Sequence, residues 1–154
     1  MIRIDFAFGA RDKWQTACEV LFKHVQAGRR LLVVADDPAI VKKVDTRLWS
    51  FSDTSFVTHA PVNHPLASQA SVLLLDTSSH PAPENLPVPD GWMMNLGRQC
   101  PPLPAGLQRL LEIVSHHEGD RTLARQRWQQ YKAAGHELRA HEIGARHGNS
   151  GRHH

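Results

Sequence analysis

The chain has 154 residues, of which 41% are apolar and 21% are charged, as in a folded domain with one core; this composition excludes a disordered or fibrous protein. No apolar run reaches the roughly 20 residues of a membrane span, and the N-terminal residues lack the apolar segment of a signal peptide, so we expect a cytoplasmic protein. The net charge of +3 is concentrated in residues 98–154, where nine Lys/Arg face five Asp/Glu; this excess predicts an acidic partner but is too small to indicate nucleic-acid binding by itself.

Strand and helix patterns alternate in the first part of the chain. Apolar alternation predicts a strand over residues 2–8, and an amphipathic helix is predicted over residues 12–28. A short apolar run indicates a buried strand over residues 30–36. The next helix is predicted over residues 36–49, with Asp37 as its cap and Pro38 at its first position. This order predicts βαβ units and a parallel or mixed sheet.

The second part of the chain is divided by two proline-rich segments. Strands are predicted over residues 55–59, 71–77 and 91–97, with a proline-rich loop over residues 78–91. After a second such segment, residues 98–106, helices are predicted over residues 107–117 and 121–135. The expected fold is a three-layer, Rossmann-like α/β open sheet, mostly parallel, with a helical C-terminal third. We expect one domain over residues 1–143 and a flexible tail over residues 144–154.

Sequence signatures of catalysis, metal binding and phosphate binding are absent. The chain contains no G-x-x-x-x-G-K-[ST] or G-x-G-x-x-G loop, and its eleven histidines have no ligand spacing. Cys18 and Cys100 are isolated thiols, which we expect to be reduced and partly buried. We therefore expect no catalytic residue, metal or cofactor. A nucleotide-binding protein or an enzyme on the same sheet remains the alternative.

The segment "RTLARQRWQQYKAAG", residues 121–135, mixes cations and aromatic rings on one side of a helix. At 100° per residue, Arg121, Arg125, Trp128 and Lys132 fall within about 60° of one another. Tyr131 is placed at the margin of this strip, and Leu123 and Ala134 on the opposite, core-facing side.

Three interpretations of this segment remain open. The strip forms a slot for a short peptide with acidic and aromatic groups. Alternatively, the two rings are half-buried core residues beside solvated cations. The third possibility is direct stacking of a single-stranded nucleic acid.

A second aromatic cluster follows the second predicted helix. Trp49, Phe51 and Phe56 lie in a segment with few aliphatic residues. They either plug the edge of the sheet or form an exposed patch for a protein partner.

Two segments together resemble one protein family. "LWSFSDTSFVTH" (residues 48–59) resembles the L-W-x(6)-F-[VI]-P-H segment of the chi subunit of bacterial DNA polymerase III. "RLLEIVSHHEGDRTLARQRWQQYKAAGHEL" (residues 109–138) resembles the closing E-[IV]-V…AR-x-R-[YFW]-x-x-Y-[RK]-x-x-G-x-x-[LI] signature of that family. The resemblance covers roughly residues 1–59 and 91–143.

The resemblance implies a non-catalytic adaptor subunit of the DNA polymerase III holoenzyme. It implies that the clamp loader is linked, through the psi subunit, to the acidic and aromatic C-terminal tail of single-stranded-DNA-binding protein. DNA itself would be contacted only indirectly, no membrane would be involved, and the protein would associate with the nucleoid through the replisome. The tail-binding positions of the family match these residues of the chain: Arg121, Arg125, Trp128, Lys132 and Val114. The resemblance assigns Trp49 and Phe56 to the surface for psi, or for another loader or helicase partner.

The chain departs from the family pattern at three positions. Trp128 stands where many members have Tyr or Phe, and Thr58 replaces the usual proline. Lys132 stands where Arg is usual. Because Lys lacks the bidentate fork that Arg offers a carboxylate, we expect a weaker contact there.

Overall fold

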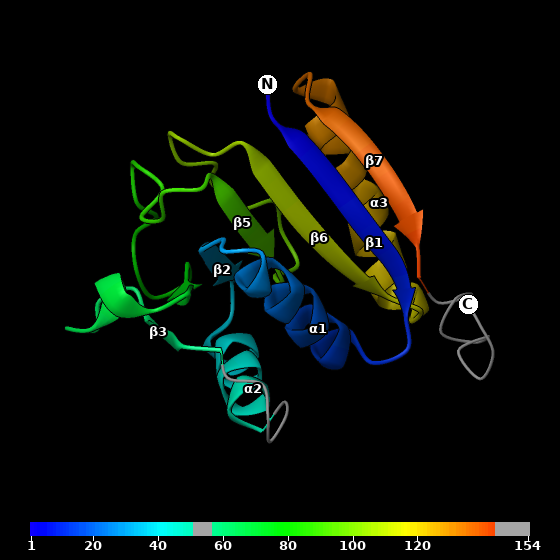
Figure 1. The fold of residues 1–154 in the computed structure, drawn as a ribbon. Helices are drawn as coiled ribbons and strands as arrows, with labels where there is room; N and C mark the ends of the chain where they lie inside the picture. The colour runs from blue at the N-terminus through cyan, green and yellow to red at the C-terminus, as the bar shows by residue number, and fades with distance from the viewer. Residues whose placement is uncertain (51–56, 144–154) are drawn as a thin grey trace.

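The computed structural model describes residues 1–50 and 57–143, and its centre is a seven-stranded sheet (Figure 1). The strands lie in the order β3-β4-β2-β5-β6-β1-β7, and their pairings are all parallel. The prediction of a mostly parallel open α/β sheet is therefore confirmed. The elements are β1 (Arg3–Ala10), α1 (Lys13–Gln26), β2 (Leu31–Ala35), α2 (Pro38–Trp49), β3 (His59–Pro61), β4 (Val72–Asp76), β5 (Trp92–Asn95), β6 (Arg109–Ser115), α3 (Glu118–Ala133) and β7 (Glu137–Glu142), with a short 3-10 helix, η1 (Ala67–Gln69).

Helices α1 and α2 cover one face of the sheet, and local signals determine where they begin. The Asp12 side chain accepts hydrogen bonds from two backbone N–H groups in the first turn of α1. Asp37 does the same for α2 by accepting from the Ala39 N–H at 2.9 Å, as predicted. The apolar sides of both helices bury Leu21 and Val44 against this face of the sheet.

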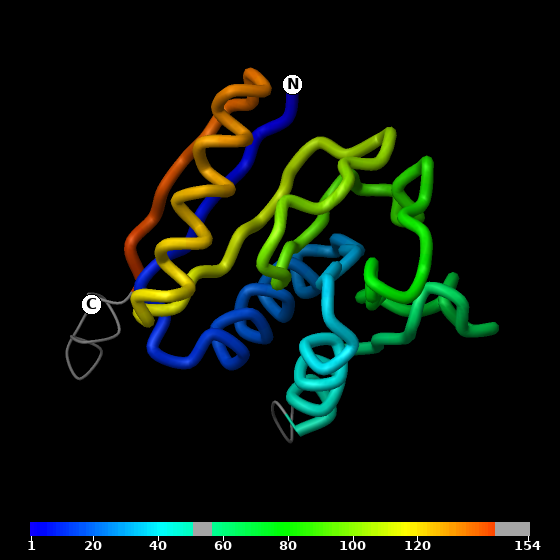
Figure 2. Tube along the Cα trace, turned by 180° about the vertical axis from the view of Figure 1, so that it is seen from behind, coloured from blue at the N-terminus to red at the C-terminus, as the bar shows by residue number. Residues whose placement is uncertain are grey.

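The opposite face is covered by α3 at one end and by the proline-rich segments at the other. Figure 2 shows α3 running over the β1 and β7 end of the sheet. The two proline-rich segments join each other through an isolated bridge between Asn85 and Ala105. Val88 and Cys100 from these segments pack on the same apolar cluster as α3. The segment over residues 78–91 thus folds down onto the sheet and completes its second layer.

For the C-terminal third, one predicted element was wrong and one strand was missed. Residues 107–117 contain strand β6 and not a helix, because β6 lies inside the sheet and is buried on both sides. A strand covered on both faces has a nearly continuous apolar run, which resembles a short helical pattern. The polar residues of β7 were not predicted as a strand, yet they pair in parallel with β1 along the edge of the sheet.

The structure also bears on the predictions for the two cysteines, for membrane spans and for the C-terminal tail. Cys18 is buried and Cys100 is partly buried, both as free thiols. Among residues 1–50 and 57–143, none of the helices has the length and apolar character needed to cross a membrane. The predicted tail, residues 144–154, lies outside the described residues, as do the first residues of the strand predicted over 55–59.

Candidate functional site

The exposed side of α3 carries the four residues of the predicted strip. Arg121, Arg125 and Lys132 are exposed, with 50% and 60% of the two arginine side chains open to solvent. Trp128 is half-buried, and its ring centroid lies 5.1 Å from that of Phe6 on β1. The indole is thus both part of the packing between helix and sheet and part of the surface. We call Arg121, Arg125, Trp128 and Lys132 the cationic strip.

A hollow of about 240 Å³ opens between this side of α3 and the sheet. It is lined by Phe6, Phe8, Val114, Arg121, Ala124, Arg125, Trp128 and Ala140. The interior of the hollow is therefore apolar and aromatic, while its two polar lining residues are both arginines. Such a hollow fits an apolar or aromatic side chain that carries a carboxylate close by. Lys132 does not line the hollow.

A carboxylate of the chain itself already lies near both arginines. The Glu118 side chain lies 3.8 Å from Arg121 Nη1 and 3.6 Å from Arg125 Nη1. Both distances exceed those of a hydrogen-bonded pair, and Glu118 is 73% exposed, so the contacts are weak. Their geometry nevertheless places one carboxylate within reach of two guanidinium groups.

Tyr131 does not lie at the margin of the strip, and this prediction was wrong. It is 3% exposed and faces the core together with Ala124 and Arg127. The core-facing side was predicted at Leu123 and Ala134, but Leu123 is only partly buried and Ala134 is exposed. The error has a physical cause: an arginine occupies the centre of the buried side, so the apolar pattern that marks such a side is interrupted.

A buried polar network fixes α3 to the sheet below the strip. Glu112 on β6 is 0% exposed and accepts hydrogen bonds from Arg127 Nε at 3.1 Å, Tyr131 Oη at 2.6 Å and Asn95 Nδ2 at 3.0 Å. Arg127 Nη1 also donates to the Arg98 carbonyl at 3.0 Å. Burial raises the pKa of Glu112, against the opposing effect of the Arg127 charge. Sequence reasoning missed this network, although Ala124, Arg127 and Tyr131 share one helical side by spacing.

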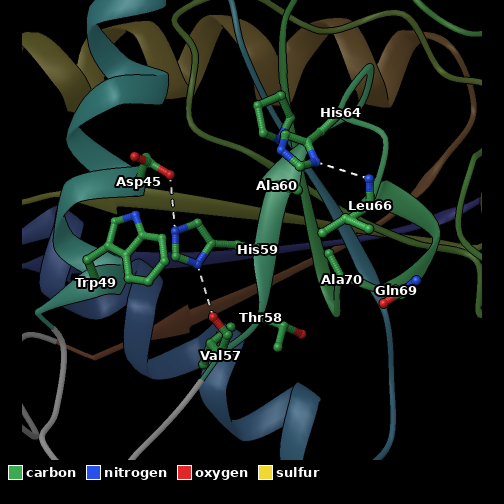
Figure 3. A pocket seen from close by; sticks show the side chains of 11 residues that line it. Asp45, Trp49, Val57, Thr58, His59, Ala60, His64, Leu66, Gln69 and Ala70 are labelled. Atoms are coloured by element: carbon green, nitrogen blue, oxygen red, sulfur yellow. Dashed lines mark hydrogen bonds and ion pairs between the residues drawn. The ribbon is translucent and has the colours of Figure 1, made fainter.

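The second predicted surface lies at the end of α2. Trp49 is 68% exposed, and its ring packs edge-on against His59 of β3 with the centroids 4.9 Å apart. The His59 Nδ1–H donates to the Val57 carbonyl at 3.0 Å, and Nε2 lies 3.0 Å from Asp45 Oδ1, as Figure 3 shows. His59 is therefore held between α2 and the chain before β3, and it supports the indole from one side.

This indole borders a hollow of about 430 Å³. The other residues around it are Asp45, Val57, Thr58, His59, Ala60, Pro61, His64, Leu66, Gln69 and Ala70. Leu66, like Trp49, is largely exposed, at 55%. Because most of its side chain is exposed, Trp49 does not fill a buried position at the edge of the sheet. Phe51 and Phe56, the other two aromatic residues of the cluster, lie outside the described residues. We call the exposed apolar region around Trp49 and Leu66 the Trp49 surface.

The described residues favour neither a metal site nor a nucleotide phosphate site. The described parts of the chain hold no group of three or more His, Cys, Asp or Glu side chains that could bind a metal ion. The first backbone N–H groups of α1, where a nucleotide phosphate would bind in a Rossmann-like fold, are occupied by the Asp12 carboxylate.

Comparison with known proteins assigns the chain to a family. The family model described as DNA polymerase III chi subunit, HolC, matches residues 1–139. The chain is also 24% identical over 151 residues to a protein from Pseudomonas aeruginosa (strain PAO1) named DNA polymerase III subunit chi. That alignment covers 93% of this chain and 98% of the relative. Because the family model matches most of its length, the chain belongs to the DNA polymerase III chi subunit family.

Proposed function

We propose that this accessory subunit of DNA polymerase III links the clamp loader to the acidic C-terminal tail of single-stranded-DNA-binding protein, with the cationic strip as the tail-binding site. The observation that carries the proposal is the hollow beside α3, in which Phe6, Phe8 and Trp128 form an apolar interior next to two arginines. An aromatic residue at the end of a peptide fills the hollow, while its terminal carboxylate and nearby acidic side chains pair with Arg121 and Arg125. Both kinds of contact are needed for tight binding, because exposed ion pairs alone contribute little.

The proposed affinity is that of a small charged site. A dissociation constant of about 1 μM corresponds to about −8 kcal/mol and should weaken as salt screens the arginines. Loss of one charge-assisted hydrogen-bonding partner costs about 1.5–3 kcal/mol, which is a loss of roughly 10- to 100-fold. Arg125 is the better residue to remove, because it is the more exposed of the two arginines, at 60%.

Isothermal titration of the full chain with a synthetic peptide tests this proposal. The peptide carries several Asp residues and a C-terminal aromatic residue. Arg125→Ala should weaken its binding by the stated factor and leave the melting temperature unchanged. Arg139→Ala on β7 removes the same charge from another exposed arginine, 53% open to solvent and paired with Glu137, and should bind as the unaltered protein does. Unchanged affinity in Arg125→Ala would refute the assignment.

For the Trp49 surface we propose the psi subunit, or another clamp-loader or helicase partner, as the bound protein. The support is an exposed indole beside exposed Leu66, at the rim of a hollow large enough for apolar side chains. Phe56 belongs to this proposal through the family resemblance, and Phe51 through its place in the same aromatic cluster of the sequence. Phe56→Ala should weaken partner capture and leave binding of the acidic peptide unchanged. A joint loss of both activities with a lowered melting temperature would show that Phe56 supports the core instead.

The subunit contributes binding and no chemistry of its own in this proposal, and it needs no cofactor. Residues 1–143 act as one unit in this proposal. It works in the cytoplasm and reaches the nucleoid through the replisome.

A further inference from the structure

A third hollow, of about 630 Å³, lies at the carboxyl ends of the strands. It contacts a different side of α3 from the cationic strip, through Gly119, Asp120 and Leu123. Its other lining residues come from the loop after β1, from α1 and α2, and from the segments that follow β5 and β6: Arg11, Asp12, Lys13, Trp14, Ile40, Lys43, Leu96, Arg98, Ser115 and His117. We call this hollow the strand-end crevice. Ligands of open α/β sheets bind at this end of the strands.

The crevice carries an excess of positive charge. Its lining has four Lys/Arg and two Asp, a balance of +2. Lys13 pairs with Asp120, and Arg98 lies 3.6 Å from Asp37. Within residues 1–50 and 57–143, by contrast, no carboxylate pairs with Arg11 or Lys43, although both are exposed. Two cations are thus available to an anionic ligand without breaking an internal ion pair.

An aromatic ring lies close to both lysines of the crevice. Trp14 is half-buried, and Lys13 Nζ and Lys43 Nζ lie 5.6 Å and 5.4 Å from the centroid of its ring. Lys13 is largely buried and fixed by Asp120, whereas Lys43 is exposed and can swing from the ring to a phosphate. A ring that can stack a base, next to cations that can pair with phosphates, is the combination found in proteins that bind single strands.

The arrangement favours a chain of phosphates over a free nucleotide. A single pyrophosphate needs backbone N–H groups that converge on it, usually at a helix N-terminus. Here Asp12 and Asp37 already cap α1 and α2, and the N-terminus of α3, which no side chain caps, carries the anionic Glu118 and Asp120 in its first turn. The cations instead come from three separate segments, the loop after β1 with the start of α1, the middle of α2, and the loop after β5.

We infer that the strand-end crevice binds single-stranded nucleic acid, with Arg11 and Lys43 on its phosphates and Trp14 against a base. This contact is direct, and it is separate from the indirect connection to DNA through the proposed tail-binding strip. The site lies among residues from both halves of the chain, so the weak charge excess of residues 98–154 does not reveal it.

Fluorescence anisotropy of the full chain with a labelled oligothymidylate of about 12 nucleotides tests the inference. Binding should be detectable at about 50 mM salt, with a dissociation constant at or below the range of about 1–100 μM that non-specific sites have at physiological salt. With about two phosphates neutralised, by Arg11 and Lys43, affinity should fall roughly sevenfold between 50 and 200 mM salt. Lys43→Glu should weaken binding about tenfold and make this salt dependence shallower.

Lys42→Glu is the matched control, because Lys42 is the exposed neighbour of Lys43 on α2, does not line the crevice and undergoes the same change of charge. It should bind the oligonucleotide nearly as well as the unaltered protein. Equal losses in the two variants would mean that only net charge matters and would overturn the inference. Absence of binding by the unaltered protein at about 50 mM salt would overturn it as well.

Competition experiments with an acidic peptide and with ATP or pyrophosphate show where the oligonucleotide binds and whether the crevice prefers a free phosphate ligand. A saturating acidic peptide should leave oligonucleotide binding in place; if the peptide displaces it, the nucleic acid binds to the cationic strip and the inference fails. Displacement by equimolar ATP or pyrophosphate would identify a free phosphate ligand and would also overturn it. Titration of each variant with the acidic peptide keeps this test separate from the proposed tail binding, which Lys43→Glu should not change.

Discussion

Arg127→Met is the substitution that best probes how α3 is held in place. The change removes the cation that pairs with Glu112, at 3.1 Å from both Arg127 Nε and Nη2, and leaves a carboxylate that is 0% exposed. Breaking one side of a buried ion pair costs about 3–5 kcal/mol, because the remaining charge stays out of water. For a chain of this length each kcal/mol lowers the melting temperature by about 2–4 °C. We therefore expect the melting temperature to decrease by about 6–20 °C.

The loss of stability in Arg127→Met should depend on pH. The pKa of Glu112 determines whether this loss grows or shrinks as the pH rises. Burial raises that pKa above its ordinary value, and removal of the Arg127 charge should raise it further. A carboxyl group with a higher pKa in the folded chain stabilises the fold when it is protonated. This contribution is complete below the unfolded pKa and is lost as the pH rises through the folded pKa. Arg127→Met should therefore destabilise the protein less at pH 5 than at pH 8.

Urea unfolding of both proteins at the two pH values measures this difference. Nearby cations lower the pKa values of Asp5 and Asp120 against the effect of burial. The stability that these two carboxylates contribute to the fold is lost as the pH falls, but the loss is the same in both proteins. Adding Glu112→Gln to Arg127→Met should recover about 2 kcal/mol at pH 8, because the buried group is then neutral. An Arg127→Met cost that is the same at both pH values, with no recovery in the double variant, would refute the reasoning.

Three further predictions concern the cationic strip and the Trp49 surface. Glu118→Gln should tighten binding of the acidic peptide about two- to fivefold by calorimetry, since it removes the carboxylate that faces Arg121 and Arg125; a weaker affinity would contradict this competition. Lys132→Ala should weaken peptide binding less than Arg125→Ala, because Lys132 does not line the hollow, and equal losses would contradict the assigned geometry. Trp49→Ala should change the melting temperature by no more than about 2 °C, because the side chain is 68% exposed, while it weakens capture of the partner at the Trp49 surface. A large thermal shift would instead show that Trp49 supports the fold.

The first four elements could be predicted from the sequence because their signals are local. Asp37 and Pro38 mark the start of α2 by their own chemistry, and the apolar run of β2 is buried on both sides. The C-terminal third depends instead on position within the sheet. Strand β6 lies inside the sheet and β7 at its edge, so one was read as a helix and the other gave no signal. Both identities follow from long-range pairing with β1, which no local pattern reports.

The cationic strip could be predicted for a similar reason, because the spacing of Arg121, Arg125 and Trp128 along one helix determines which side they share. The rest of the hollow could not. Phe6, Phe8 and Ala140 reach it from β1 and β7, so their part depends on how α3 crosses the sheet. Tyr131 shares a helix with the strip, but the buried Glu112 is its hydrogen-bonding partner and draws its hydroxyl group inward.

The indole N–H signals of the four tryptophans provide the most direct test of the central claim. In a ¹⁵N-labelled full chain, Trp14, Trp49, Trp92 and Trp128 each give one such signal, which single Trp→Phe variants assign. Addition of the acidic, aromatic-ended peptide should shift the Trp128 signal in proportion to occupancy and leave those of Trp14 and Trp49 in place. A saturable shift of the Trp14 or Trp49 signal, with that of Trp128 unmoved, would contradict the proposal that the cationic strip binds the tail.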